Sequence, residues 1–247
     1  MASNTETGHA KNVATFEDLI SFCAAYGAAY NPSKAGLKIT ALNTQLAAAN
    51  AALQAVKSAK TAYDNATNAR EIAFKPLKPL ATKVVNALAA TDATEQTVAD
   101  ARSSNNKLQG KRVKAVEKPD AQALAAGTEP VRTASVSQQS FDKVIDNFAQ
   151  LIATLTAEPK YLPNENDLKL AALNALLTDM KAKNTAVINA TTALSNARIA
   201  RNKALYEDNT GLVDTAMAVK IYVKSVYGAI SPQFKQVSTL KFVKKPS

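Results

Sequence analysis

The feature that most constrains this chain is an internal repeat. Residues 30–74 align without a gap over residues 161–205, and 19 of the 45 aligned positions are identical. Eight of these identities are alanine, which any two alanine-rich helices share by chance, so the other 11 carry the evidence. They include Pro32/Pro163, Asn43/Asn174, Asn65/Asn196 and Arg70/Arg201. The pattern is that of a tandem duplication.

Each copy is predicted to fold as a helix, a turn, a long helix and a shorter helix, which makes the fold class all-α. Upstream of the alignment, residues 15–22 resemble residues 140–148, and Thr15 and Ser140 are expected as N-caps. A Tyr-x-Pro turn then ends the first helix. The long helices are expected at 33–75 and 164–206, and the shorter ones at 80–90 and 212–227, with an extra helix at 93–104 in the first copy.

Alanines recur in the long helices at alternating steps of four and three, the spacing of coiled-coil a and d positions. They are Ala55, Ala59, Ala62, Ala66, Ala69 and Ala73, repeated as Ala186, Ala190, Ala193, Ala197, Ala200 and Ala204. Small residues allow a close helix approach, so we expect the long helices to pack antiparallel, seam against seam, in an elongated bundle. Each seam could instead pack on a helix of its own copy.

A second stripe of mostly bulky residues is expected to face the remaining helices. It contains Leu42, Leu46, Leu53 and Val56, matched in the second copy by Leu173, Leu177, Asn184 and Val187. The predicted organisation is a disordered tail (1–14), a first helical copy (15–106), an irregular connection (107–139) and a second helical copy (140–247). Both copies are expected to form one bundle domain.

Composition indicates a soluble, basic protein. The formal net charge is +10 and the pI about 9.6, which favours an acidic partner. The chain has no basic start followed by an apolar run and no stretch of 18 apolar residues, so neither a secretory signal nor a transmembrane helix is expected. The single cysteine, Cys23, fits a reducing compartment. We therefore expect a cytoplasmic location.

The residues that enzymes and metal sites need are scarce. His9 is the only histidine and is expected to lie in the polar tail, which removes histidine-based triads and metal sites. Cys23 lies on an apolar helix without a basic neighbour, so a buried, inert thiol is expected. No glycine-rich phosphate loop is present among the seven glycines. The expectation is a protein that is not an enzyme and has no cofactor and no metal.

Two sets of basic residues are candidate binding sites. Arg70 and Arg201 recur in both copies and could bind one anion at a symmetry axis, or could form a polar layer with Asn65 and Asn196 that sets helix register. The second set follows corresponding helices and could attract phosphates without reading sequence; otherwise it forms solvated ends. Its members are Lys107, Lys111, Arg112, Lys114, Lys241, Lys244 and Lys245.

Two stretches carry a resemblance to known proteins. They are the segment beginning "YLPNENDLKLAALN" at residue 161 and the ending "SPQFKQVSTLKFVK". The chain resembles a family of uncharacterised, duplicated α-helical proteins of Bacteroidetes bacteria. The resemblance implies a bacterial helical protein and no activity.

Taken together, the sequence favours a non-enzymatic structural or interaction protein of the bacterial cytoplasm. Its partner would be an unknown protein or another copy of the chain. The first alternative is weak, sequence-independent binding of nucleic acid or another polyanion through the basic residues. The second is a protein of storage-granule or lipid-body surfaces, because phasins are also alanine-rich and helical.

Overall fold

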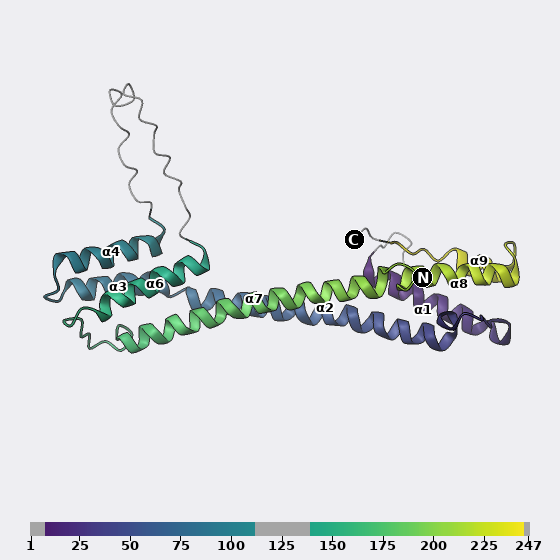
Figure 1. Ribbon diagram of the computed structural model, residues 1–247, viewed down its shortest axis with the longest axis horizontal. Coiled ribbons are helices and arrows are strands. Elements are labelled where there is room, and N and C mark those ends of the chain that lie inside the picture. The colour runs from purple at the N-terminus through teal and green to yellow at the C-terminus, as the bar shows by residue number, and fades with distance from the viewer. Residues whose placement is uncertain (1–7, 112–138, 245–247) are drawn as a thin grey trace, which may run out of the picture. The chain divides into compact units, whose positions relative to one another are not determined.

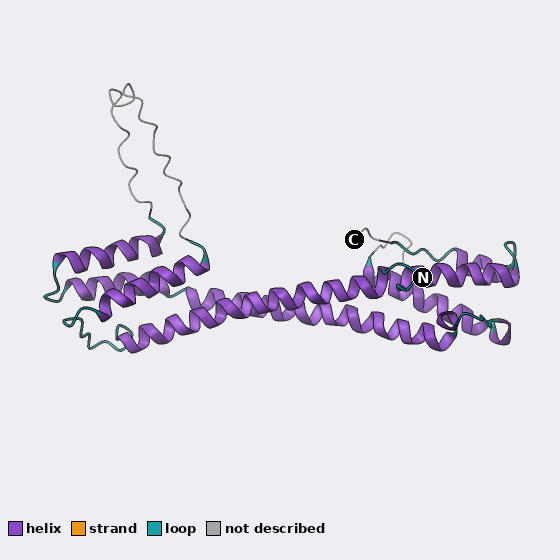
Figure 2. Cartoon of the chain, in the orientation of Figure 1, coloured by secondary structure: helices purple, strands orange, loops and turns teal. Residues whose placement is uncertain are grey.

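Every regular element of the computed structural model is a helix (Figure 2). The structure describes residues 8–111 and 139–244, and within those ranges it contains no strand, which confirms the all-α class. The α-helices, labelled in Figure 1, are α1 (His9–Ala25), α2 (Ile39–Phe74), α3 (Leu77–Ala89), α4 (Glu95–Gln109), α6 (Phe141–Thr156), α7 (Leu170–Tyr206), α8 (Leu212–Tyr227) and α9 (Pro232–Ser238). Two short 3₁₀ turns, η1 (Gly27–Ala29) and η2 (Ala35–Leu37), precede α2.

The chain divides into two compact units, and the division falls inside the two longest helices. The first, which we call the terminal unit, consists of Met1–Asp64 and Asn189–Ser247. The second, the central unit, consists of Asn65–Ile188. The expectation of one bundle domain is thus replaced by two units, and each of them contains part of both predicted copies. Most of the predicted connection, 107–139, lies outside the described residues.

Several helices begin where a hydroxyl side chain caps the first turn. The Ser140 hydroxyl accepts a hydrogen bond of 3.3 Å from the backbone N–H of Lys143, which confirms the predicted N-cap of α6. Thr94 and Ser231 cap α4 and α9 in the same way. The helix α9 had no counterpart among the predicted elements.

The start of α1 differs from the prediction. Thr15 is not an N-cap: it lies in the middle of α1 and is only 3% exposed, and the helix begins at His9 after Gly8. The buried stripe of α1 already includes Asn12 and Val13, so the helix must begin before them. The predicted disordered tail is therefore wrong for residues 9–14.

Both long helices begin six residues later than predicted, at Ile39 and Leu170. In each case a buried tyrosine hydroxyl donates a hydrogen bond of 2.8 Å to the carbonyl seven residues further on. The bonds join Tyr30 to Leu37 and Tyr161 to Leu168. These bonds hold the intervening residues in a folded loop, which delays the helix in the same way at both places.

The core of the terminal unit forms where α1 packs against α8 and the ends of the long helices. Apolar residues spaced three and four apart on α1 are fully or nearly fully buried, as expected for an amphipathic helix. The fully buried members of this core are Phe16, Leu19, Cys23, Leu42, Ala49, Leu205, Leu212, Ala216, Val219, Val223 and Val237. Leu46 and Leu53 of the predicted bulky stripe pack against it.

The central unit has its own core, formed by α3, α4, α6 and the first part of α7. The helix α4 packs against both α3 and α6. Fully buried residues are Ala81, Val84, Leu88, Ala101, Leu108, Phe148, Leu151, Leu155, Leu173 and Met180. Leu177 and Asn184 of the predicted stripe are also buried.

Buried positions recur between the units at constant separations. Four buried residues of α1 match four of α6 at a distance of 132 residues: Val13/Ile145, Phe16/Phe148, Leu19/Leu151 and Ile20/Ile152. Four of α3 match four of α8 at 135 residues: Leu77/Leu212, Ala81/Ala216, Val84/Val219 and Leu88/Val223. The alignment of Thr15 with Ser140 was therefore seven residues out of register, which is two helical turns on the same face.

Seven of the twelve alanines of the ladder are buried or half-buried, and five are exposed. The first group is Ala59, Ala66, Ala69, Ala73, Ala190, Ala197 and Ala204, and the exposed group is Ala55, Ala62, Ala186, Ala193 and Ala200. The residue that follows each exposed alanine is often large and less exposed, as at Val56, Tyr63, Val187, Leu194 and Arg201. The predicted seam is thus wrong at the five exposed alanines, because at these places the next, larger side chain takes the inward position.

Candidate interaction surface

Arg70 belongs to a polar cluster inside the central unit. Its Nη1 donates a hydrogen bond of 3.1 Å to Oδ1 of Asn184, which is buried on α7. Asn184 Nδ2 in turn donates one of 2.8 Å to Oδ1 of Asp142. The guanidinium carbon lies 3.7 Å from the ring centroid of Phe141, the distance of a cation–π contact. Arg70 therefore joins three helices, α2, α6 and α7.

Arg201, its sequence counterpart, is bonded differently. Its Nε and Nη2 donate hydrogen bonds of 3.1 and 2.8 Å to Oδ1 of the neighbouring Asn202, in the terminal unit. The repeated Asn65 and Asn196 are exposed. Each arginine is thus bonded within its own unit, which favours the structural role over a shared anion site.

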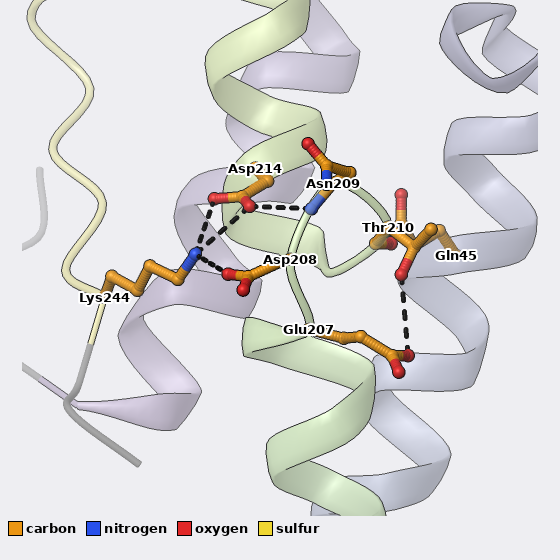
Figure 3. Close-up of polar contacts among 7 residues, drawn as sticks. All are labelled: Gln45, Glu207, Asp208, Asn209, Thr210, Asp214 and Lys244. Atoms are coloured by element: carbon orange, nitrogen blue, oxygen red, sulfur yellow. Dashed lines mark hydrogen bonds and ion pairs between the residues drawn. The ribbon is translucent and has the colours of Figure 1, made fainter.

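Lys244 near the C-terminus is held by two carboxylates at the turn between α7 and α8 (Figure 3). Its Nζ lies 2.7 Å from Oδ1 of Asp208 and 3.1 Å from Oδ2 of Asp214. The backbone N–H of Asn209, a residue with φ of 65°, donates a further bond of 2.9 Å to Asp214. This N–H and Lys244 together hold the pKa of Asp214 below its ordinary value. The same carboxylates raise the pKa of Lys244, so its charge is already paired.

The turn that carries Asp208 needs a glycine at its end. At Gly211 a Cβ atom would lie 2.6 Å from the backbone nitrogen of Glu207, too close for any other residue without a backbone shift. The turn is tied to α2 as well, because Gln45 Nε2 donates a hydrogen bond of 2.8 Å to the carbonyl of Thr210. The predicted helix break at 207–211 is confirmed, and it serves as the anchor of the C-terminal segment.

The other predicted basic residues are divided between the two units. Lys107 and Lys111 are exposed in the central unit, and Lys241 is exposed in the terminal unit. Arg112, Lys114 and Lys245 lie outside the described residues. Of the candidates that the structure describes, Lys244 is bound in ion pairs, while the other three keep exposed side chains.

The candidate groups for chemistry are bonded or buried. Burial raises the pKa of the Cys23 thiol to about 12, although a hydrogen bond with Tyr30 opposes the shift, so at neutral pH the thiol is protonated and shielded. His9 lies in α1 rather than in a tail, with Nδ1 2.7 Å from the Tyr206 hydroxyl. Among residues 8–111 and 139–244, no three His, Cys, Asp or Glu side chains are grouped as a metal site would need.

A surface that the sequence analysis did not single out is the outward side of α8. Met217, Ile221 and Lys224 follow one another at steps of four and three, so they share one face of the helix. This face is opposite the buried positions of α8, and Met217 and Ile221 are 48% and 69% exposed. Ile230, in the turn that leads from α8 to α9, is 87% exposed. We call Met217, Ile221, Lys224 and Ile230 the α8 surface.

The equivalent face in the central unit is polar. At the separation of 135 residues given by the buried positions, Met217 corresponds to Thr82 of α3 and Ile221 to Asn86. Both are exposed. Two helices with the same buried pattern therefore differ on their outward faces, so the frame of the unit does not require apolar residues there. The signal in the sequence was a second apolar pair, four residues apart, outside the main stripe of α8.

The charged residues that follow Met217 in the chain are all basic. After Asp214 the chain contains no Asp or Glu. Lys224 lies on the face itself, with Nζ 5.7 Å from the ring centroid of Phe234, and Lys235 of α9 is exposed. Lys220 does not contribute to this surface, because its ammonium donates a hydrogen bond to the carbonyl of Leu240.

Comparison of the chain with protein-family models, curated proteins and solved structures finds no match. The resemblance to helical proteins of Bacteroidetes bacteria therefore stays an expectation. Within the part of the chain that the structure describes, no helix is long and apolar enough to cross a membrane.

Proposed function

We propose that this chain is a non-enzymatic interaction protein whose partner binds the α8 surface. The observation that carries the proposal is the contrast between Met217 and Ile221 on α8 and their polar counterparts Thr82 and Asn86 on α3. Single exposed apolar side chains are common on protein surfaces, whereas neighbouring ones on the same helix face mark an interaction site. The polar clusters around Arg70 and Lys244 are explained by structural bonding, which leaves the α8 surface as the stronger candidate.

The architecture behind this surface is proposed to come from a tandem duplication. The support is threefold: the alignment at 131 residues, the two Tyr-to-carbonyl bonds in the same place, and the matched buried positions of α1 with α6 and α3 with α8. Each unit then takes its first helix from one copy and its third helix from the other. In this proposal the copies differ on the outward face of α8, at Met217 and Ile221.

A photo-crosslinking experiment tests the proposed function. A photoreactive amino acid replaces Ile221 in the full chain, in cells that make the protein naturally, and the control carries the same group at Ile72, which is 72% exposed in the central unit. The expected result is a specific adduct, of whatever chemical class, from position 221 and not from position 72. Equal labelling at both positions, or no adduct at position 221, would contradict the proposal.

Binding of a polyanion is the second candidate, supported by the exposed side chains of Lys107, Lys111 and Lys241. It is weakened at Lys244, whose ammonium already lies against two carboxylates. Each phosphate neutralised on duplex DNA would steepen the slope of log affinity against log salt by about 0.9. A gel-shift titration at low salt tests it: replacing Lys107 and Lys111 should flatten the slope, whereas Lys244→Ala should leave it unchanged. A chain that shifts no DNA or RNA at low salt does not have this function.

A further inference from the structure

The α8 surface lies on one side of a single helix and on the turn that follows it. Ile221 and Ile230 stand out from the protein with more than half of their surface exposed. The helices α1 and α9 and the turn η2 contact α8, and Met217 and Ile221 stay exposed beside these contacts. A fluid lipid surface can close around side chains that protrude in this way, because an interfacial helix needs no matching groove.

The charge at this site opposes a second copy of the same surface as the natural partner. Lys224 lies on the face, and the exposed Lys235 and Lys241 follow it in the chain without any acidic residue between them. Two such surfaces would repel each other on approach. The acid on the same face of α8, Asp214, is already bonded to Lys244 and to the backbone of Asn209. The α8 surface therefore combines the exposed apolar Met217 and Ile221 with the cationic Lys224, and the carboxylate of Asp214 beside them is already paired.

From this combination we infer that the α8 surface docks on anionic phospholipid membranes. The inference rests on the proposed function and names the partner of the same surface. Met217, Ile221 and Ile230 would enter the boundary between headgroups and acyl chains, while the lysines contact the phosphates. The chain would lie on the membrane without crossing it, in keeping with the absence of a spanning helix among the described residues.

Vesicle flotation tests this inference with the full chain. The vesicles contain phosphatidylglycerol and phosphatidylcholine in equal amounts, or phosphatidylcholine alone. The test variant is Met217→Thr/Ile221→Asn/Ile230→Ser, whose first two changes copy the residues at the equivalent positions of α3. The matched control is Ile72→Asn, an equally exposed isoleucine of the central unit.

We expect the unmodified chain and the Ile72→Asn control to float with the anionic vesicles. Binding should be weaker by about tenfold or more in the triple variant, because the burial of its apolar side chains is lost. Binding should also weaken on vesicles of phosphatidylcholine alone, and with added salt. No binding to anionic vesicles, or an equal loss in the control, would overturn the inference. Because the replaced side chains are exposed, circular dichroism should show the same helix content in all three proteins.

A fluorescent reporter gives an independent readout. The chain has no tryptophan, so Ile221→Trp introduces a single one on the α8 surface, and Ile72→Trp does so elsewhere. Anionic vesicles should shift the emission of the first to shorter wavelength and leave the second unchanged. An unchanged emission at position 221 overturns the lipid inference. A protein adduct in the crosslinking experiment, together with that result, would leave the proposed function standing with a different partner.

Discussion

The terminal and central units share the same arrangement of helices and differ in the element that covers it. Each has a capped or early-starting first helix, a Tyr-to-carbonyl loop, part of both long helices and a third helix with the same buried positions. In the central unit the 15-residue helix α4 covers α3 and α6. In the terminal unit the 7-residue α9 takes that place, and Lys244 then ties the segment that follows to the α7–α8 turn. The comparison teaches that the buried positions recur in both units, whereas the covering helix and the exposed faces differ.

The clearest difference lies at the start of the first helix in each unit. In the central unit Phe141 of α6 packs edge-on against Phe74, with ring centroids 4.9 Å apart. In the terminal unit His9 of α1 packs against Tyr206, at 5.5 Å. In both units the pair joins the end of a long helix to the start of the first helix. The terminal unit adds a hydrogen bond to the aromatic contact. One unit therefore closes with an apolar pair and the other with a polar one.

The largest expected effect comes from removing the central ring of either core. Phe148→Ala and Phe16→Ala should each lower the free energy of unfolding by about 3–5 kcal/mol, because both rings are fully buried. Hydrogen exchange should rise first in the unit that carries the substitution. An equal rise in both units after either substitution would mean that they unfold as one body, which would break the comparison.

A smaller effect is expected from enlarging alanines of the long helices. Ala73→Leu should cost about 1–3 kcal/mol, because Ala73 is buried. Ala62→Leu should change stability by less than about 0.5 kcal/mol, because Ala62 is exposed. Urea denaturation of both variants measures the difference. An equal loss of stability in the two variants would mean that both alanines face inward, as the continuous alanine seam requires.

The polar closing pair is expected to contribute less again. Tyr206→Phe removes the hydroxyl that lies 2.7 Å from His9 Nδ1 and 3.4 Å from Asn12 Nδ2. The loss should be about 0.5–1.5 kcal/mol, the usual net value of such bonds. The substitution makes the terminal pair resemble that of the central unit, where Phe74 has no hydroxyl. A variant as stable as the original chain would show that the hydroxyl adds nothing to the aromatic contact.

The smallest effect is expected at Lys244, whose ion pairs are solvent-exposed. Since the pKa of Asp214 is lowered in the folded protein, the stabilisation is present above its ordinary value of 3.8 and is lost as the pH falls through the folded value. Thermal melts of Lys244→Ala and the unmodified chain should therefore differ slightly at pH 7 and converge in acid. A difference that persists in strong acid would point to packing by the lysine stem instead.

Much of the fold could be predicted because apolar periodicity reports burial directly. The helix α8 was predicted at its observed bounds, and the first helices end at Ala25 and Thr156, five residues before the Tyr-x-Pro turns that were predicted to end them. The start of α1 was missed because its Gly8 cap carries no side-chain signal, while Thr15 imitated one. The alanine spacing on α2 did not tell whether the alanines or the residues that follow them face inward, because small side chains fit on either the buried or the exposed side of a helix. The division into units also left no trace in composition, because it falls within continuous helices.

The candidate sites were harder to predict. Arg70 was expected to pair with the repeated asparagines, but its partner Asn184 aligns with Leu53, so the alignment pointed away from it. The pairing of Lys244 with Asp208 and Asp214 joins residues 30 or more positions apart, which local charge patterns do not reveal. Exposed apolar residues such as Ile221 become informative only when the buried face of the helix is known.

Dividing the chain at two different places tests most directly the claim that each compact unit draws on both copies. The central unit is continuous in sequence, so a fragment of residues 65–188 should fold alone, with a helical spectrum and a cooperative melt. Fragments 1–111 and 139–247, each with one copy, should show weak helicity alone and regain it when mixed in equal amounts. If each single-copy fragment instead melts cooperatively alone while the 65–188 fragment is unfolded, the account of two units built from both copies is contradicted.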